Sequence, residues 1–161
     1  QIAKENITDF VNSEKKHSKM EITRYILDNI SYTLDGRFQY IADIKVKNKD
    51  LIFYLHQIVK ERFGERKQQL GTESVMQDYM RRCTLKAIDD AWIEQVDYLQ
   101  QLQTAERGRA SAQRNVQFEY QKESMRAFQI MEKRIKRNII RNILLGSVTV
   151  YPDGDMELLL P

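Results

Sequence analysis

Residues 74–102, "SVMQDYMRRCTLKAIDDAWIEQVDYLQQL", carry the longest uninterrupted helical pattern of the chain. Their apolar residues recur at steps of three or four without Gly or Pro, which is the period of an amphipathic α-helix. The stripe that begins after Thr72 comprises Val75, Met76, Tyr79, Met80, Cys83, Ala87, Ala91, Trp92, Val96, Leu99 and Leu102. A helix of this extent is roughly 50 Å long, at a rise of about 1.5 Å per residue. We expect Trp92 to be the buried anchor between this helix and its neighbours.

A second helical pattern follows the short, arginine-rich stretch at residues 107–115, "RGRASAQRN". Asn115 is the predicted N-cap of this helix, and Gly146 marks its end. Its predicted buried stripe comprises Met125, Phe128, Met131, Ile135, Ile139 and Ile143. Because the connection is short, the two helices must run antiparallel as an αα-hairpin.

The residues before Thr72 predict shorter helices. Ser18 and Glu21 have the spacing of a capping box, and the helix after them is expected to reach Leu34, with Gly36 in the left-handed position beyond its end. A further helix is predicted from about residue 50 to residue 63, ended by Gly64. Another short helix is indicated upstream by Ile7, Phe10 and Val11.

The last fifteen residues, "SVTVYPDGDMELLLP", change to strand-like alternation around a Pro-Asp-Gly turn. The predicted fold is therefore mainly α: a long antiparallel helical hairpin with a smaller helical subdomain and a short C-terminal β-hairpin. The corresponding divisions are 1–71, 72–146 and 147–161. Because an isolated β-hairpin is marginally stable, we expect this one to dock on the helices.

Composition narrows the class of protein. The chain has 161 residues and begins with Gln1, so we expect it to be part of a longer chain. No apolar run has the roughly 18 residues that a membrane-spanning helix needs. A single cysteine, Cys83, cannot form an internal disulfide, and with only His17 and His56 as imidazoles no zinc-ligand set is evident. A reducing, cytoplasmic setting fits best.

Positive charge is concentrated in the second half of the hairpin. Residues 101–145 carry 10 Lys and Arg residues against four acids, whereas residues 1–100 carry 16 of each sign. A stripe on the second long helix comprises Lys133, Arg134, Arg137 and Arg141. Such a stripe can attract an anionic membrane or nucleic acid, or it can be a solvated face. Aromatic residues do not interleave with it, which makes nucleic acid the less favoured partner.

Catalytic motifs are absent from the sequence. It contains no phosphate-binding loop of the G-x-x-x-x-G-K-[ST] type and no G-x-G-x-x-G after a strand. The adjacent Asp89 and Asp90 point about 100° apart on a helix and cannot converge on one site. His17 and His56 lie in ordinary amphipathic surroundings and are interpreted as surface or packing residues. We therefore expect no enzymatic activity, bound metal or cofactor in this segment itself.

The hairpin nevertheless has an individual signature. Ile88-Asp89 and Trp92 fit an I/L-D-x-x-W pattern, and a second group of matches lies on the other side of the connection. That group comprises Arg109, Gln113, Glu119-Tyr120, Glu123-Ser124, Phe128 and Met131. In these residues, aligned without a gap from about residue 80 to residue 131, the chain resembles the two-helix finger of SecA, the ATPase motor of bacterial protein export.

Several positions depart from the usual SecA pattern. Gln95, Gln100 and Gln103 replace a histidine, an aspartate and an arginine, and Ser111 stands where the family carries a tip tyrosine. Asn115-Val116 replaces Asp-Pro, and no cysteine-rich zinc tail is present. These changes resemble the accessory SecA of Gram-positive bacteria, which exports a restricted set of surface glycoproteins.

The resemblance implies a division of roles. Residues 1–71 would correspond to the helical wing, and the helical scaffold would resume at Thr72. The finger tip, which in the family contacts the preprotein and the mouth of a SecY-type channel, would comprise Arg107, Arg109, Ser111, Gln113 and Arg114. The motor domains of the same chain would use ATP and Mg²⁺. The full-length protein would be an ATP-driven translocase, cytoplasmic and peripherally associated with the membrane.

Overall fold

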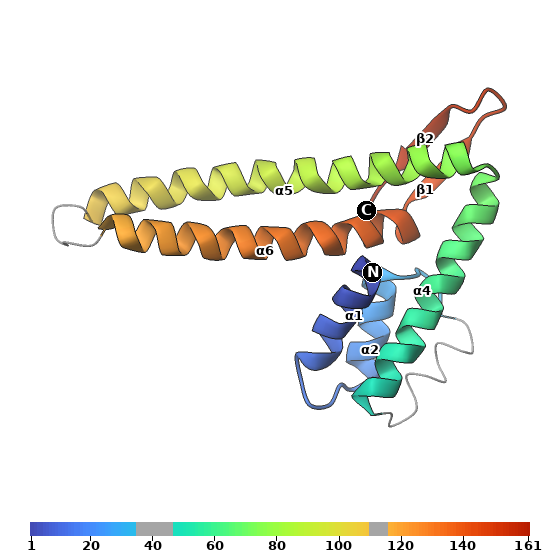
Figure 1. Cartoon of the computed structure of the whole chain (residues 1–161), viewed down its shortest axis with the longest axis horizontal. Coiled ribbons are helices and arrows are strands. Elements are labelled where there is room, and N and C mark those ends of the chain that lie inside the picture. Colours follow the sequence, from blue (N-terminus) through green and yellow to red (C-terminus); the bar gives the residue numbers. More distant parts are fainter. Residues whose placement is uncertain (35–46, 110–115) are drawn as a thin grey trace.

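The computed structural model describes residues 1–34, 47–109 and 116–161. These residues form five α-helices and one antiparallel two-stranded sheet, so the predicted mainly α class is confirmed. The elements are α1 (Ile2–Asn12), α2 (Lys19–Asn29), α4 (Asn48–Leu70), α5 (Glu73–Arg109), α6 (Val116–Leu145), β1 (Ser147–Val150) and β2 (Met156–Leu159). Figure 1 shows α5 and α6 side by side as a long antiparallel pair, with α1, α2 and α4 grouped near the C-terminal end of α6.

The start of α2 follows the predicted cap, but its end does not follow the prediction. The Ser18 hydroxyl accepts a hydrogen bond from the Glu21 N–H at 3.2 Å. The helix ends at Asn29 rather than Leu34, because the Ser31 N–H bonds to the Ile26 carbonyl, which already accepts from Ile30, and not to the Leu27 carbonyl that a continuing helix would use. The buried Ile30 side chain is thereby turned into the core. Gly36 and Asn115, the other predicted cap residues, lie outside the described residues.

Helix α4 continues through Gly64, where the sequence predicted its end. An exposed glycine inside a helix costs only about 1 kcal/mol relative to alanine, so favourable packing further along can carry the helix past it. Here that packing comes from Leu70, which is buried, and from Arg66, which binds the end of α6. The helix stops at Gly71, whose φ of 83° lies in the region that glycine adopts without strain.

One continuous hydrophobic core joins the small helices to the base of the hairpin. It includes Ile7 of α1, Ile26 of α2 and Leu55 of α4, each with 1% or less of its surface exposed. Tyr79 of α5 and Ile143 of α6 belong to the same cluster. The subdomain therefore does not hang from a linker but shares its interior with the two long helices.

The C-terminal strands also join this core. The inward-facing residues Val148 and Met156 are buried, which explains why so short a hairpin is ordered. Strand β1 pairs with β2 antiparallel, and the turn is closed by hydrogen bonds from the Tyr151 N–H to the Asp155 carbonyl and from the Gly154 N–H to the Tyr151 carbonyl. Gly154 has a φ of 87°, as the predicted Pro-Asp-Gly turn requires.

Trp92 is not the buried anchor that the sequence predicted: 46% of its surface is exposed. The residues of α5 that face α6 at this level are Ala91 and Gln95, both buried. Trp92 follows Ala91 and is therefore rotated by about 100° around the helix, away from the partner. The apolar stripe of the sequence is broader than one neighbouring helix can cover.

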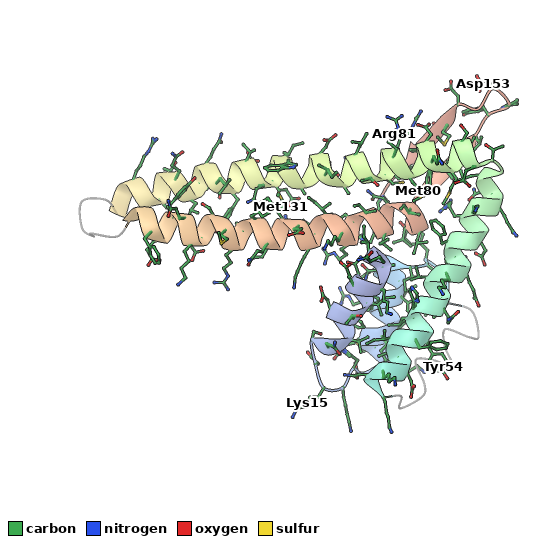
Figure 2. All side chains as sticks on the ribbon, in the orientation of Figure 1. Lys15, Tyr54, Met80, Arg81, Met131 and Asp153 are labelled. Atoms are coloured by element: carbon green, nitrogen blue, oxygen red, sulfur yellow. The ribbon has the colours of Figure 1, made fainter. Side chains whose placement is uncertain are left out.

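The same geometry corrects the stripe predicted for α6. Met125 is 67% exposed and Phe128 is 48% exposed, whereas Ala127 and Met131 are buried. Met131 lies between the two long helices (Figure 2). Among the described helices, none combines the length and the hydropathy that crossing a membrane requires.

Candidate functional site

Of the residues predicted to form the finger tip, Arg107 lies at the end of the hairpin farthest from the small helices. Helix α5 ends at Arg109, and Arg107, in its last turn, is exposed. Ser111, Gln113 and Arg114 lie outside the described residues, as does the side chain of Arg109. The structure therefore establishes where the tip is carried, while the roles of its side chains remain predictions.

Small residues let the two long helices approach each other along the shaft of the hairpin. Cys83, Ala87 and Ala91 of α5 are buried, as is Ala127 of α6. Burial raises the pKa of the Cys83 thiol to about 11, so this cysteine is a packed, unreactive side chain. We call this closely packed contact between α5 and α6 the seam, and it makes the hairpin rigid.

A groove of about 520 Å³ lies between the helices in the middle of the shaft. Both helices contribute to its lining, which comprises Glu94, Gln95, Tyr98, Glu123, Arg126, Ala127, Ile130, Met131 and Arg134. Arg134 pairs with the Glu94 carboxylate and so links α6 to α5 at the groove. Gln95, which replaces the histidine of the usual family pattern, is 7% exposed, so this position faces α6.

Outside the seam, each long helix keeps an exposed apolar stripe. Leu85, Trp92 and Val96 lie on one face of α5, since they are separated by seven and four residues. Phe118, Met125 and Phe128 lie on one face of α6 for the same reason. Several large apolar side chains exposed on one helix face are candidates for contact with another surface. We call these two sets the finger stripes.

A polar joint fastens the base of the hairpin to α4. The Arg66 guanidinium donates to the carbonyls of Ile143, Leu144 and Gly146, at 3.2, 3.2 and 2.5 Å. The Tyr79 hydroxyl donates to the carbonyls of Asn142 and Ile143, at 3.0 and 2.9 Å. Among these acceptors, the Ile143 and Leu144 carbonyls belong to the last turn of α6, which leaves its final carbonyls without helical partners. Burial raises the pKa of Tyr79 far above its usual range, so the hydroxyl keeps the proton that it donates.

Asn142 completes this joint from the α6 side. Its side-chain amide donates to the Cys83 carbonyl at 3.0 Å, and only 5% of its surface is exposed. Neither Arg66 nor Asn142 was predicted from the sequence as a functional residue. Asn142 carried a detectable signal, because it is a polar residue beside the apolar position Ile143 on the inner face of α6.

The basic stripe predicted on α6 is largely engaged within the fold. The Lys133 ammonium lies 3.8 Å from the Asp9 carboxylate, Arg134 pairs with Glu94, and the Arg141 Nε donates to the Asp28 carbonyl at 2.7 Å. Arg137 makes no ion pair with a described residue, although its charge acts on the hydroxyl of the neighbouring Tyr25. Most of the stripe thus holds α6 to α1, α2 and α5, which weakens its interpretation as a surface for anions.

The two histidines differ in their surroundings. His56 is partly buried in α4, and burial together with the nearby Lys60 lowers the pKa of its imidazole. His17 lies between α1 and α2, with only 2% of its side chain exposed. Both are packing residues, as predicted, but His17 is also hydrogen-bonded at both ring nitrogens.

A small helical subdomain that shares its core with a long, rigid helical hairpin defines a reaching or scaffolding module. Residues 1–146 match the family described as the SecA Wing and Scaffold domain. The chain therefore belongs to the SecA family, and it supplies the wing and scaffold part of such a protein.

The curated relatives agree with this assignment. The chain is 41% identical over 145 residues to the protein translocase subunit SecA 2 of Streptococcus agalactiae, an alignment that covers 90% of the chain and 17% of that protein. It is 33% identical to the SecA 2 of Streptococcus sanguinis over 89% of the chain and 18% of that protein. The SecA 2 of Staphylococcus aureus is also 33% identical, over 95% of the chain and 19% of that protein.

The chain spans less than a fifth of the length of these relatives. The prediction of a SecA-type segment is confirmed, and the relatives carry the SecA 2 name that the accessory assignment leads one to expect. The matched part is the wing and scaffold, which is distinct from the ATPase motor.

Proposed function

We propose that this chain is the wing and two-helix finger of a protein-export motor, and that its α5–α6 hairpin contacts the preprotein and a SecY-type channel through the tip. The observation that carries the proposal is the reach of the hairpin. Helix α5 has 37 residues and α6 has 30, but the shared core involves only their base. At about 1.5 Å per residue, α5 alone is about 55 Å long.

The mechanical properties of the hairpin suit this role. Buried small residues hold the shaft together, and the joint made by Arg66, Tyr79 and Asn142 anchors its base to α4. Movement of the small helices is thereby transmitted to the tip with little bending between them. The finger stripes offer apolar surface to the motor domains of the same chain, the channel or the client.

For the rest of the mechanism we propose what is general for the family. The motor domains of the full-length protein supply ATP hydrolysis with Mg²⁺, and the chain acts at the cytoplasmic face of the membrane. The client belongs to a restricted class of exported proteins, such as surface glycoproteins. The alternative, a basic helical module for nucleic acid or an anionic membrane, is less favoured because Lys133, Arg134 and Arg141 have partners within the fold.

The test is photo-crosslinking in the full-length protein during reconstituted export. A photoreactive residue at Ser111 or Arg107 is expected to label the client or the channel mouth only while transport is active. The control position is Lys60, which is exposed on α4 and is not part of the α5–α6 hairpin. Equal labelling from the tip and from Lys60, or none from the tip during transport, would refute the finger role.

A further inference from the structure

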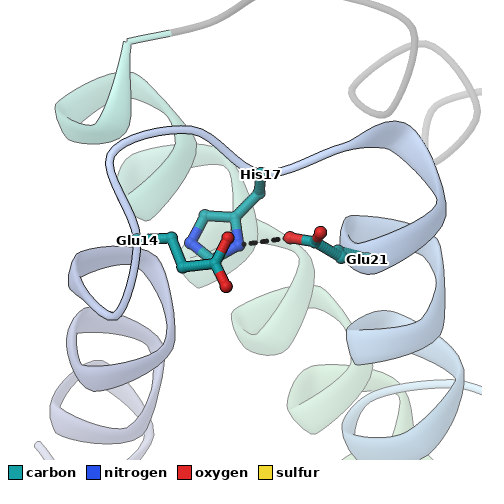
Figure 3. A group of neighbouring side chains, drawn as sticks. All are labelled: Glu14, His17 and Glu21. Atoms are coloured by element: carbon teal, nitrogen blue, oxygen red, sulfur yellow. Dashed lines mark hydrogen bonds and ion pairs between the residues drawn. The ribbon is translucent and has the colours of Figure 1, made fainter.

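His17 lies in the turn between α1 and α2, where its ring is held at both nitrogens. Nε2 lies 2.9 Å from the Val11 carbonyl oxygen, and Nδ1 lies 3.0 Å from Oε2 of Glu21. Figure 3 shows the dashed contact from the imidazole to the Glu21 carboxylate, with the Glu14 carboxylate overlapping the ring in this view. Because only 2% of the His17 side chain is exposed, water does not compete freely for either nitrogen.

The hydrogen bonds restrict what can occupy the space beside Nδ1. A carbonyl oxygen only accepts, so Nε2 must carry a hydrogen. In the neutral imidazole, Nδ1 then has a lone pair and no hydrogen. It faces Oε2 of Glu21, and an ionised carboxylate oxygen also only accepts. A hydrogen atom, carried by either Nδ1 or Oε2, or a metal ion must therefore lie between these two atoms.

Glu14 distinguishes the two alternatives. A protonated imidazole needs only Glu21 as its partner, whereas a metal ion needs further ligands. The ligand atoms of Glu14, His17 and Glu21 all lie within 4.8 Å of one another. The Glu14 carboxylate makes no hydrogen bond or ion pair with a described residue, so no interaction within the described fold accounts for its position beside the ring.

We propose that Glu14, His17 and Glu21 bind a divalent transition-metal ion, and that Zn²⁺ is the best fit. Zinc commonly takes imidazole nitrogen and carboxylate oxygen in one site, whereas Mg²⁺ and Ca²⁺ prefer oxygen alone. The bond from Nε2 to the Val11 carbonyl is the kind of outer contact that orients metal-binding histidines. Solvent would complete the coordination, because both glutamates are exposed.

Such an ion would brace the wing. Glu14 and His17 belong to the turn after α1, while Glu21 belongs to the first turn of α2. The Asn48 side chain, at the start of α4, donates to the carbonyls of Val11 and Glu14, both at 3.4 Å. An ion bound here would therefore hold α1 against α2 at a point that already contacts α4. This role is independent of the proposed finger function.

The experiment is a Zn²⁺ titration of the full-length protein against a chromogenic chelator, with the wild type compared with three variants. The decisive variant is Glu14→Gln, which removes one ligand from the surface and leaves the His17–Glu21 contact in place. We expect Zn²⁺ affinity at this site to fall at least about tenfold in Glu14→Gln. His17→Gln should remove one bound Zn²⁺ per chain, whereas His56→Gln, which removes an imidazole from α4, should leave binding unchanged.

A second measurement identifies the ligand atom. Nitrogen NMR of the imidazole of His17 should show a Zn²⁺-dependent shift at Nδ1, with no effect of excess Mg²⁺. Wild-type protein that binds no Zn²⁺ at micromolar concentration would show that a proton alone lies between Nδ1 and Glu21. Binding that is equally strong in Glu14→Gln and His17→Gln would place the metal elsewhere. Either result would overturn the proposal.

Discussion

At the scale of single residues, the tightest constraint lies at Gly146, where α6 passes into β1. A Cβ atom at this position would lie 2.5 Å from the Asn142 carbonyl oxygen, 2.8 Å from the Tyr79 hydroxyl and 2.9 Å from a methyl carbon of Leu160. The backbone oxygen cannot move without breaking the end of α6, so the position requires glycine for space. Gly64, by contrast, lies in the interior of α4, where an added Cβ would meet nothing within 4 Å.

Gly146→Ala is therefore expected to destabilise the protein, by about 1–3 kcal/mol, the usual cost of an extra methyl in a packed site. Gly64→Ala is the matched control and should stabilise it by about 0.5–1 kcal/mol, because alanine favours a helix and loses less chain entropy. Chemical denaturation of both variants measures the two free energies of unfolding. Equal effects of the two substitutions would show that the crowding at Gly146 is relieved at no cost.

Trp92 provides a second residue-scale prediction, and a clean one because the chain has a single tryptophan. With 46% of its surface exposed, its fluorescence should be quenched readily by iodide in the folded segment. Trp92→Ala should lower the free energy of unfolding by about 1 kcal/mol or less, compared with about 3–5 kcal/mol for a fully buried tryptophan. Strong protection from iodide would mean that another surface covers the stripe on α5.

At the scale of elements, the end of α6 depends on a residue from another helix. The planar guanidinium of Arg66 of α4 donates to the Ile143 and Leu144 carbonyls of the last turn of α6 and to the Gly146 carbonyl just beyond it. The same group lies 5.6 Å from the centre of the Tyr79 ring. One side chain thus connects α4, α5 and α6 at the point where β1 begins.

Arg66→Lys keeps the charge but cannot reproduce this fork of donors. We expect it to cost about 2 kcal/mol of stability and to increase amide exchange at the end of α6 and in β1. The control is Arg62→Lys on the same helix, since among the described residues Arg62 pairs only with Glu65, a surface contact that should contribute about 0.5 kcal/mol or less. If both lysine variants unfolded alike, the carbonyl contacts of Arg66 would have no special weight.

At the scale of the whole molecule, an ion pair and a hydrogen bond accompany the apolar contact between the small helices and the hairpin. The Lys136 ammonium lies 3.1 Å from the Glu5 carboxylate, and the Asn6 side chain donates to the Lys136 carbonyl at 3.1 Å. The hydrogen bond and charge of Lys136 lower the pKa of Glu5, and Glu5 in turn raises the pKa of Lys136. These contacts attach α1 to the middle of α6.

The pH dependence of this attachment follows from the lowered pKa of Glu5 and the raised pKa of Lys136. Because the pKa of Glu5 is lower in the folded state, its contribution is present above the usual value of 4.5 and is lost as the pH falls through the lowered value. The contribution of Lys136 is present below its usual value of 10.5 and is lost as the pH rises through the raised value. The attachment should therefore be strongest between these limits and weaken in salt.

Glu5→Gln tests this directly. The variant should show a smaller loss of stability than the wild type between about pH 7 and about pH 3 in urea denaturation. Asp97→Asn, which removes an exposed carboxylate of α5 that has no ion pair with a described residue, should follow the wild-type pH profile. An unchanged profile in Glu5→Gln would show that the pair with Lys136 contributes nothing measurable to the attachment.

The presence and order of the elements could be predicted from local signals, whereas the ends of α2 and α4 could not. Uninterrupted periodicity from Thr72, a short connection and Gly146 predict an αα-hairpin, because these signals act within a few residues of the chain. The family could also be predicted, from the ungapped alignment of Trp92, Glu119-Tyr120 and the tip residues with the SecA pattern. Which side of each broad stripe is buried could not be predicted in this way, because burial depends on how many neighbours a helix has. For this reason Trp92 and Phe128 are exposed while Ala91 and Ala127 are covered.

The roles of the charged residues likewise depend on tertiary contacts. In the sequence, Lys133, Arg134 and Arg141 form one basic face, but their partners Asp9, Glu94 and the Asp28 carbonyl come from three other helices. The glutamates around His17 are close in sequence, yet it is the bond from the ring to the Val11 carbonyl that directs Nδ1 toward Glu21. Sequence periodicity predicts which residues share one face of a helix. The packing of segments distant in the sequence determines which residues that face contacts.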